Sequence, residues 1–264
     1  MDLAVDYSVF RSDSPESMLV EIYHSIPFQE LRYEERNETL YGSYWVDFKV
    51  SDLAGRGIVA HGVFEPVVIP LSLEPAKHGL MVTHSFSLKL VPGKYVMVLQ
   101  ATDSGESGCV TETLAVRDLG RTPSLSDPYL GNSVVRTAGG MISVMPSAGR
   151  RFGARLGPEM YIYVEGYGFP VPSSRSETAF HYVATQVLNA AGQVVKEFPV
   201  EQASRVSDGL VAMYGVTTQG LKPGDYRLHI EVWDAKTGMK AASEKGFVVV
   251  GHAPSATAPM VDRG

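Results

Sequence analysis

Apolar and polar residues alternate with a period of two along many short segments of the chain. In EMYIYVEGYGF, residues 159–169, one side collects the apolar residues Met160, Ile162 and Val164. The other side collects three tyrosines and a glutamate, which are Tyr161, Tyr163, Glu165 and Tyr167. Because successive side chains of a β-strand point to opposite faces, this segment predicts a strand with an apolar inner face and a tyrosine-rich outer face.

One such pattern occurs twice. LVPGKYVMVLQATD (90–103) and LKPGDYRLHIEVWD (221–234) share Leu-x-Pro-Gly-x-Tyr, an alternating strand and a closing aspartate. Pro-Gly is typical of a type II turn, in which the glycine takes a positive φ. Tyr95 and Tyr226 then open a late strand, which is typical of the tyrosine corner of Greek-key sandwiches. In that corner the ring is buried and its hydroxyl bonds to the chain just upstream.

The repeat extends upstream. YWVDFKVSDLAGRGIV (44–59) and HYVATQVLNAAGQVV (181–195) each predict a strand, a turn from Asp or Asn to Gly, and a second strand. LVEIYHS (19–25) corresponds to IYVEGYG (162–168). Short strands at intervals of about 8–12 residues, repeated twice, predict an all-β fold of two tandem immunoglobulin- or fibronectin-III-like β-sandwich domains. One large barrel or jelly roll is the alternative.

Composition along the chain predicts the domain boundaries. We expect four parts: a first β-sandwich in 1–118, a linker in 119–134, a second β-sandwich in 135–251, and a flexible tail in 252–264. The linker is rich in Pro, Gly and Ser and shows little alternation. It still carries four large apolar or aromatic residues, Leu119, Leu125, Tyr129 and Leu130, so we do not expect a free tether.

Composition also excludes several classes of function. A net charge of −6 and a pI near 5.7 argue against general nucleic-acid binding, which requires a basic excess. No apolar run approaches the roughly 18 residues of a membrane span. The first residues show no basic start followed by an apolar block, so no signal peptide is visible. The single cysteine, Cys109, excludes an intramolecular disulfide and a multi-cysteine zinc site.

Motifs for catalysis or metal binding are not found. The sequence lacks Gly-x-Ser-x-Gly, a phosphate-binding glycine loop and His-Glu-x-x-His. The histidines are scattered without ligand spacing: His24, His61, His78, His84, His181, His229 and His252. We expect no catalytic residue, metal or cofactor, and a core or edge position for Cys109. Three arginines in one glycine-rich turn, Arg150, Arg151 and Arg155, are interpreted as a solvated loop rather than an anion site.

The order of these features resembles a known family. Residues 6–34 followed by 44–59 resemble the N-terminal β region of bacterial GWxTD-domain proteins. Residues 142–169, with a Pro-Ser turn and a tyrosine-rich strand near Glu-x-Tyr, resemble the segment that follows there. The Gly-Trp-x-Thr-Asp string itself is absent, so the likeness covers only the β-sandwich half. It implies a non-enzymatic module that is periplasmic or part of the cell envelope, and it transfers no catalytic residue.

Outward aromatic residues form the candidate interaction surface. Its members are Tyr161, Tyr163, Tyr167, Tyr182, His229 and Trp233. Tyrosine combines apolar area with a hydroxyl, which suits recognition. Four explanations stay open for the tyrosines: packing on the first domain or the linker, a partner protein, a carbohydrate, or plain sheet surface.

The function predicted from sequence is a non-enzymatic structural or protein-interaction module of a bacterial cell-envelope protein or complex. Its partner would be a protein or a subunit of a larger assembly, with neither nucleic acid nor a membrane span. A carbohydrate-binding accessory module is one alternative and predicts a row of exposed rings. A hydrolase with a discontinuous interdomain site is another, and it predicts carboxylates or histidines that converge in the cleft.

Overall fold

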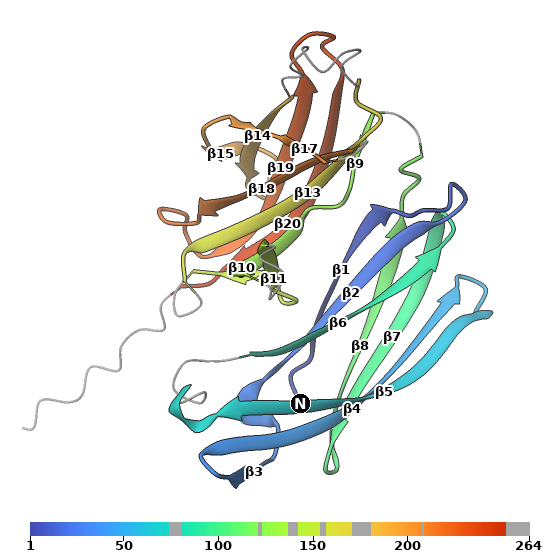
Figure 1. Ribbon diagram of the computed structural model, residues 1–264, viewed down its shortest axis with the longest axis vertical. Helices are drawn as coiled ribbons and strands as arrows, with labels where there is room; N and C mark the ends of the chain where they lie inside the picture. The colour runs from blue at the N-terminus through green and yellow to red at the C-terminus, as the bar shows by residue number, and fades with distance from the viewer. Residues whose placement is uncertain are drawn as a thin grey trace, which may run out of the picture.

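The computed structural model describes residues 1–73, 81–120, 123–136, 142–153, 157–170, 181–206 and 209–251. The predicted all-β fold class is confirmed, with four antiparallel or mixed sheets (Figure 1). Within the described residues the only helical elements are two short 3-10 turns, η1 (Phe28–Glu30) and η2 (Leu71–Leu73). None of the described helices is long and apolar enough to cross a membrane. The predicted tail, 252–264, lies outside the described residues.

Strands between Ala4 and Val116 form two facing sheets around one core. The first sheet has the order β1-β2-β6, with bounds β1 (Ala4–Arg11), β2 (Met18–Pro27) and β6 (Met81–Leu90). The second has the order β3-β4-β7-β8, with β5 also paired to β4: β3 (Tyr33–Arg36), β4 (Thr39–Asp52), β5 (Gly57–Pro70), β7 (Gly93–Asp103) and β8 (Glu106–Val116). Inward residues of both sheets, such as Ile22, Phe48 and Leu99, share one hydrophobic cluster. We call this part the N-terminal half.

Strands between Ser124 and Val249 form the other two sheets, the C-terminal half. One has the order β11-β10-β13-β18-β17, with β9 on β13: β9 (Ser124–Leu125), β10 (Tyr129–Arg136), β11 (Ile142–Pro146), β13 (Glu159–Tyr167), β17 (Ser204–Val206) and β18 (Gly209–Thr217). The other has the order β12-β20-β19-β14-β15, with β16 on β14: β12 (Arg151–Phe152), β14 (His181–Leu188), β15 (Val194–Glu197), β16 (Glu201–Gln202), β19 (Gly224–Asp234) and β20 (Lys240–Val249). A second hydrophobic cluster joins Ile162 to Leu228 and Ile230.

The same strand order recurs in the two halves. The order β1-β2-β6 corresponds to β10-β13-β18, and β5-β4-β7-β8 corresponds to β15-β14-β19-β20. The strands predicted as counterparts therefore occupy equivalent places, with β2 matching β13 and β4 matching β14. The segment predicted as the linker contains β9 and most of β10, because its apolar residues Leu125 and Leu130 enter the second core.

The turn that follows β4 is repeated after β14. Asp52 Oδ1 accepts hydrogen bonds from the amides two and four residues later, each at 2.9 Å. Asn189 Oδ1 makes the same two contacts at 3.0 Å. A glycine three residues after each of them takes a positive φ, 81° at Gly55 and 78° at Gly192. The local sequence thus determines both hairpins in the same way.

The hydrogen bond of the predicted tyrosine corner is present in both halves, and the ring is buried at Tyr95 but only half-buried at Tyr226. The hydroxyl of Tyr95 donates to the carbonyl of Val91 at 2.9 Å, and that of Tyr226 donates to the carbonyl of Lys222 at the same distance. The predicted type II turn is wrong at both glycines, because Gly93 and Gly224 already begin β7 and β19. Gly93 has no positive φ, and the φ of 154° at Gly224 is far from the roughly +80° that a type II turn requires. A Cβ at Gly93 would lie 3.5 Å from the Tyr95 hydroxyl, which is an ordinary van der Waals contact.

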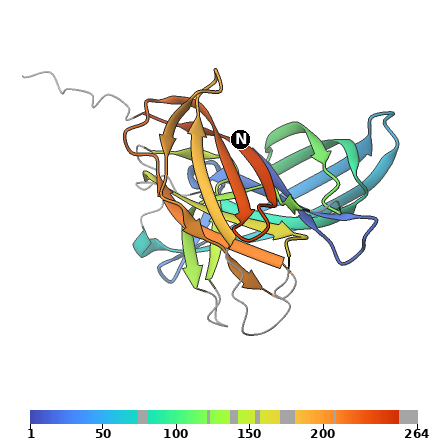
Figure 2. The same cartoon turned by 90° about the horizontal axis from the view of Figure 1, so that it is seen from above.

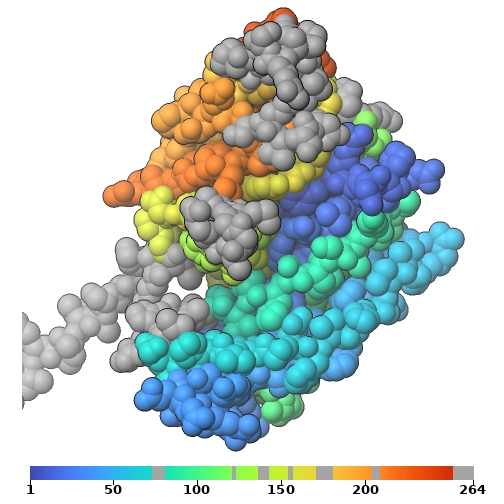
Figure 3. Space-filling model, in the orientation of Figure 1, coloured from blue at the N-terminus to red at the C-terminus, as the bar shows by residue number. Residues whose placement is uncertain are grey.

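The two halves lie side by side (Figures 1 and 2). The sheet of β1 and β2 faces the sheet of β10 and β13, and Figure 3 shows the blue N-terminal strands directly against the green and yellow surface of the C-terminal half. Strands β4 and β5 lie on the far side of the N-terminal half, away from this contact.

Candidate functional site

The tyrosine-rich face of β13 is covered largely by the N-terminal half. Tyr167 is buried and belongs to the N-terminal hydrophobic cluster, and its hydroxyl accepts the amide of Arg11 at 3.0 Å. The ring of Tyr163 lies 6.1 Å from that of Phe10, measured between centroids. Tyr161 is half-buried and lies against Gly215 on the neighbouring strand. Tyr163 and Tyr167 therefore join the two halves of this chain, whereas the contact of Tyr161 with Gly215 lies within the C-terminal half.

The repeated Glu-x-Tyr sequence places the same polar contact on each side of this interface. Tyr23 on β2 donates to Glu21 at 2.6 Å, and Tyr167 on β13 donates to Glu165 at 2.6 Å. Tyr163 donates to the second oxygen of Glu165 at 2.5 Å. Burial, followed by the neighbouring carboxylate, raises the pKa of all three phenols above the ordinary value. They consequently remain protonated donors at neutral pH.

A buried ion pair also crosses the interface. Lys245 on β20 lies 2.9 Å from Asp6 on β1, and both side chains are less than a tenth exposed. The ammonium of Lys245 also donates to the carbonyl of Tyr7. Arg150 approaches the same carboxylate at 3.7 Å. The interpretation of the arginine turn as a solvated loop is therefore wrong for Arg150, while Arg155 lies outside the described residues.

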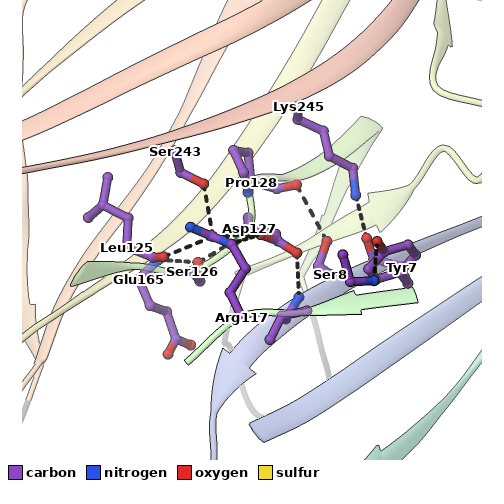
Figure 4. A network of polar contacts seen from close by, with 12 residues as sticks. Tyr7, Ser8, Arg117, Leu125, Ser126, Asp127, Pro128, Glu165, Ser243 and Lys245 are labelled. Carbon is purple, nitrogen blue, oxygen red and sulfur yellow. Dashed lines mark hydrogen bonds and ion pairs between the residues drawn. The ribbon is translucent and has the colours of Figure 1, made fainter. Parts of the chain in front are cut away.

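The segment between the halves is fixed by hydrogen bonds (Figure 4). Asp127 donates its amide to the carbonyl of Val9 at 3.0 Å and accepts the amide of Val9 at 3.1 Å. Arg117 binds the same carboxylate at 2.6 Å. Ser126 donates its amide to the carbonyl of Glu165 at 2.8 Å and accepts the amide of Glu165 at 2.9 Å. The segment thus joins β1 to β13 through hydrogen bonds of its backbone and of its Asp127 and Ser126 side chains.

The remaining predicted surface residues lie elsewhere. Tyr182 and Trp233 are cross-strand neighbours on β14 and β19, with ring centroids 5.6 Å apart. His229 on β19 contacts Glu244 at 3.0 Å. All three side chains are half-buried on the second sheet of the C-terminal half, whereas the three tyrosines belong to the first. The six predicted residues therefore do not form one surface.

The outer face of β4 and β5 carries the exposed rings that the predicted surface lacked. Trp45 is 45% exposed and lies opposite Phe64, which is 58% exposed. Four residues earlier on the same face of β4, Tyr41 is 43% exposed and lies opposite Val68, which is 59% exposed. The alternation in YWVDFKV already points Trp45 outward. We call these four residues the aromatic stripe.

A shallow depression of about 440 Å³ adjoins the aromatic stripe. Its outward lining residues come from β4, β5 and β7: Asp47, Lys49, Ala60, Gly62, Val98 and Gln100. Within the described part of the chain, the side chains of Asp47, Lys49 and Gln100 make no hydrogen bond or ion pair. Cys109 is exposed on the edge strand β8 of the same sheet.

A larger cleft of about 910 Å³ opens between the halves. It lies between the ends of β1, β2 and β6 and the hairpin of β10 and β11, where a bulge separates Gly131 from Ser133. Its lining includes one carboxylate, Asp2, one arginine, Arg151, and no histidine. Among the described residues, no group of three His, Cys, Asp or Glu side chains is arranged to hold a metal ion.

One buried histidine interrupts the apolar core of the N-terminal half. His24 is fully buried, and its Nε2 lies 3.0 Å from the hydroxyl of Tyr44. Its ring stacks on His84, with centroids 6.0 Å apart, and His84 contacts Glu65 at 2.9 Å. Burial, with a smaller contribution from His84, lowers the pKa of His24 to about 4. The imidazole is therefore neutral at pH 7.

Comparison with protein families finds no match, and comparison with curated proteins finds none either. Among solved structures, the chain is similar to the C-terminal domain of the Streptococcus agalactiae AgI/II polypeptide BspA, with 11% identity, a TM-score of 0.23, and coverage of 94% of this chain and 100% of that chain. Another match is yellow lupin purple acid phosphatase PPD1, with 10% identity, a TM-score of 0.27, and coverage of 93% of this chain and 40% of that chain. Bifidobacterium dentium β-glucuronidase matches with 11% identity, a TM-score of 0.26, and coverage of 88% and 40%. Similarities this low carry no argument about function.

Proposed function

We propose that the chain is a non-enzymatic structural or protein-interaction module of a bacterial cell-envelope protein or complex. The observation that carries this proposal is the interface between the halves. A buried ion pair, the hydrogen bond from the Arg11 amide to the Tyr167 hydroxyl and a hydrogen-bonded connecting segment hold the two sandwiches in one orientation. Domains within one chain usually move relative to one another unless such an interface joins them. A fixed pair suits a unit that presents a surface at a defined angle.

The aromatic stripe supports the interaction part of the proposal. Soluble proteins rarely expose contiguous apolar patches, and larger ones mark interaction sites. The stripe also borders β5, whose second edge pairs with no described strand. Sheet edges and exposed aromatic side chains are common contacts in protein recognition. The cell-envelope location follows from the resemblance to GWxTD-domain proteins.

Photocrosslinking in the native source tests the proposal. We would place p-benzoylphenylalanine at Phe64, and at Val194 as the matched control. Val194 is 46% exposed and lies on β15, the counterpart of β5. The expected result is one protein adduct from position 64 that purified wild-type chain competes away and that Trp45→Asp abolishes. Equal labelling from both positions, or no adduct from position 64, would overturn the proposed protein contact.

A carbohydrate-binding accessory module is the second candidate. The depression beside Trp45 favours it, because free polar side chains lie on one side of an exposed ring there.

A further inference from the structure

We propose that the outer face of β4, β5 and β7 binds a neutral, flat polysaccharide across Trp45. This site goes beyond the proposed protein contact and requires no partner protein. It consists of the depression described above together with the aromatic stripe that borders it.

The ring of Trp45 is held in place before any ligand arrives. A Cβ at position 62 would lie 2.7 Å from Cζ2 and 3.0 Å from Nε1 of Trp45, so the indole lies directly against the backbone of Gly62. Only glycine permits this approach. The side chain nevertheless remains 45% exposed, which leaves ring surface open to solvent. A ring fixed in this way loses little conformational entropy on binding.

The polar groups of the depression match the requirements of sugar hydroxyls. Asp47 supplies acceptors, Lys49 supplies donors, and Gln100 supplies both. These side chains have no partner among the described residues, so their hydrogen-bonding capacity is available to a ligand. Asp47 and Lys49 carry opposite charges and lie two residues apart on β4. The site therefore has no net charge and favours a neutral ligand over a polyanion.

A pyranose ring combines the two properties that this face offers. Its axial C–H groups form an apolar face that packs on an aromatic ring, while its hydroxyls project around the rim. A protein hot spot would instead fill a closed, desolvated pocket. The depression is open and small, about 440 Å³, near the lower end of ligand pockets.

The aromatic stripe extends the platform along the strand. Tyr41 precedes Trp45 by four residues on the same face of β4, which places their Cα atoms about 13 Å apart. An extended glycan could therefore contact both rings. β-1,4-linked hexopyranoses adopt such a flat, extended form, and we expect the site to prefer them to the coiled α-1,4-linked chain.

The two tryptophans allow a direct test, because one lies in each half. In Trp233→Phe the remaining tryptophan is Trp45, and in Trp45→Phe it is Trp233. The probes are cellohexaose and chitohexaose, with maltohexaose as the coiled comparison. We expect a saturable change in tryptophan emission from Trp233→Phe with at least one β-linked probe, and none from Trp45→Phe. Calorimetry of Trp45→Ala and Gly62→Ala should show affinity reduced at least about ten-fold.

Three outcomes would overturn this inference. They are no saturable change with either β-linked probe up to about 10 mM, a change reported by Trp233 instead of Trp45, and equal binding of maltohexaose. Circular dichroism of each variant confirms that it is folded. A protein adduct at position 64 without glycan binding would reject the glycan site and leave the proposed protein contact intact. Glycan binding without an adduct at position 64 would support the glycan site and reject the proposed protein contact.

Discussion

Tyr95 and Tyr226 close the same corner in each half, each through one hydrogen bond to a carbonyl four residues upstream. Removing only the Tyr95 hydroxyl, in Tyr95→Phe, should lower the free energy of unfolding by about 1 kcal/mol. Tyr95→Ala also removes a ring that is 93% buried and should cost about 3 kcal/mol or more. Urea unfolding measures both. Equal effects of the two substitutions would show that the ring contributes little.

His24 makes the stability of the N-terminal half depend on pH. Its folded pKa of about 4 lies below the unfolded value near 6.5, so the unfolded chain takes up the proton first as the pH falls. Stability should therefore fall by about 3 kcal/mol between pH 6.5 and pH 4 and then level off. The groups facing the imidazole are Tyr44, Phe86 and His84, which in turn contacts Glu65.

The measurement compares unfolding curves of wild type and His24→Phe across this pH range. The substitution keeps an aromatic ring beside His84 but has no proton to gain, so the pH dependence should be about 3 kcal/mol smaller. A variant with the same pH slope as the wild type would show that His24 does not titrate in this range.

At the scale of elements, the turn after β4 allows the effect of backbone conformation on stability to be measured apart from the effect of packing. Gly55 has φ 81°, and a Cβ added there would meet no atom within 4 Å, so Gly55→Ala should cost about 1 kcal/mol through conformation alone. Gly57, two residues later, has equally open space and no positive φ. Gly57→Ala should therefore be neutral or slightly stabilising in thermal unfolding. Equal losses at the two positions would contradict the role of φ at Gly55.

Elements were predictable from sequence where a local pattern determines them. The turns at Asp52 and Asn189 and the corners at Tyr95 and Tyr226 depend on residues close in sequence, and the hydrogen bonds of each were found as expected. The alternation of residues also predicted that Tyr163 and Tyr167 lie on the outer face of their strand. Alternation reports only the face of a strand, and it carries no information about which other sheet packs on that face. The covering of Tyr167 by β1 therefore required the three-dimensional arrangement.

The same limit explains why the six predicted residues lie on two different sheets. Tyr182 and Trp233 alternate outward just as Tyr163 does, yet they belong to the opposite sheet of the C-terminal half. Trp45 also alternates outward, but its 45% exposure and its contact with Gly62 on β5 depend on the neighbouring strands. Neither fact follows from the period of the strand that carries Trp45.

At the scale of the whole molecule, the ion pair of Asp6 and Lys245 couples the two halves. Lys245→Met leaves the buried carboxylate of Asp6 with only Arg150, 3.7 Å away, as a partner among the described residues, and should cost about 3 kcal/mol. The double variant Asp6→Leu, Lys245→Met removes both charges and should recover most of that loss. Lys89→Met, which breaks an exposed pair with Asp13, should change stability by less than about 1 kcal/mol.

Fluorescence of each tryptophan measures the coupling, because Trp45 reports the N-terminal half and Trp233 the C-terminal half. With the interface intact, the variants Trp233→Phe and Trp45→Phe should unfold in urea with nearly the same midpoint, since neither half opens without breaking the shared contacts. Adding Lys245→Met should separate the two midpoints. Midpoints that differ already with the pair intact would show two independent sandwiches, and the fixed orientation on which the proposed function rests would be lost.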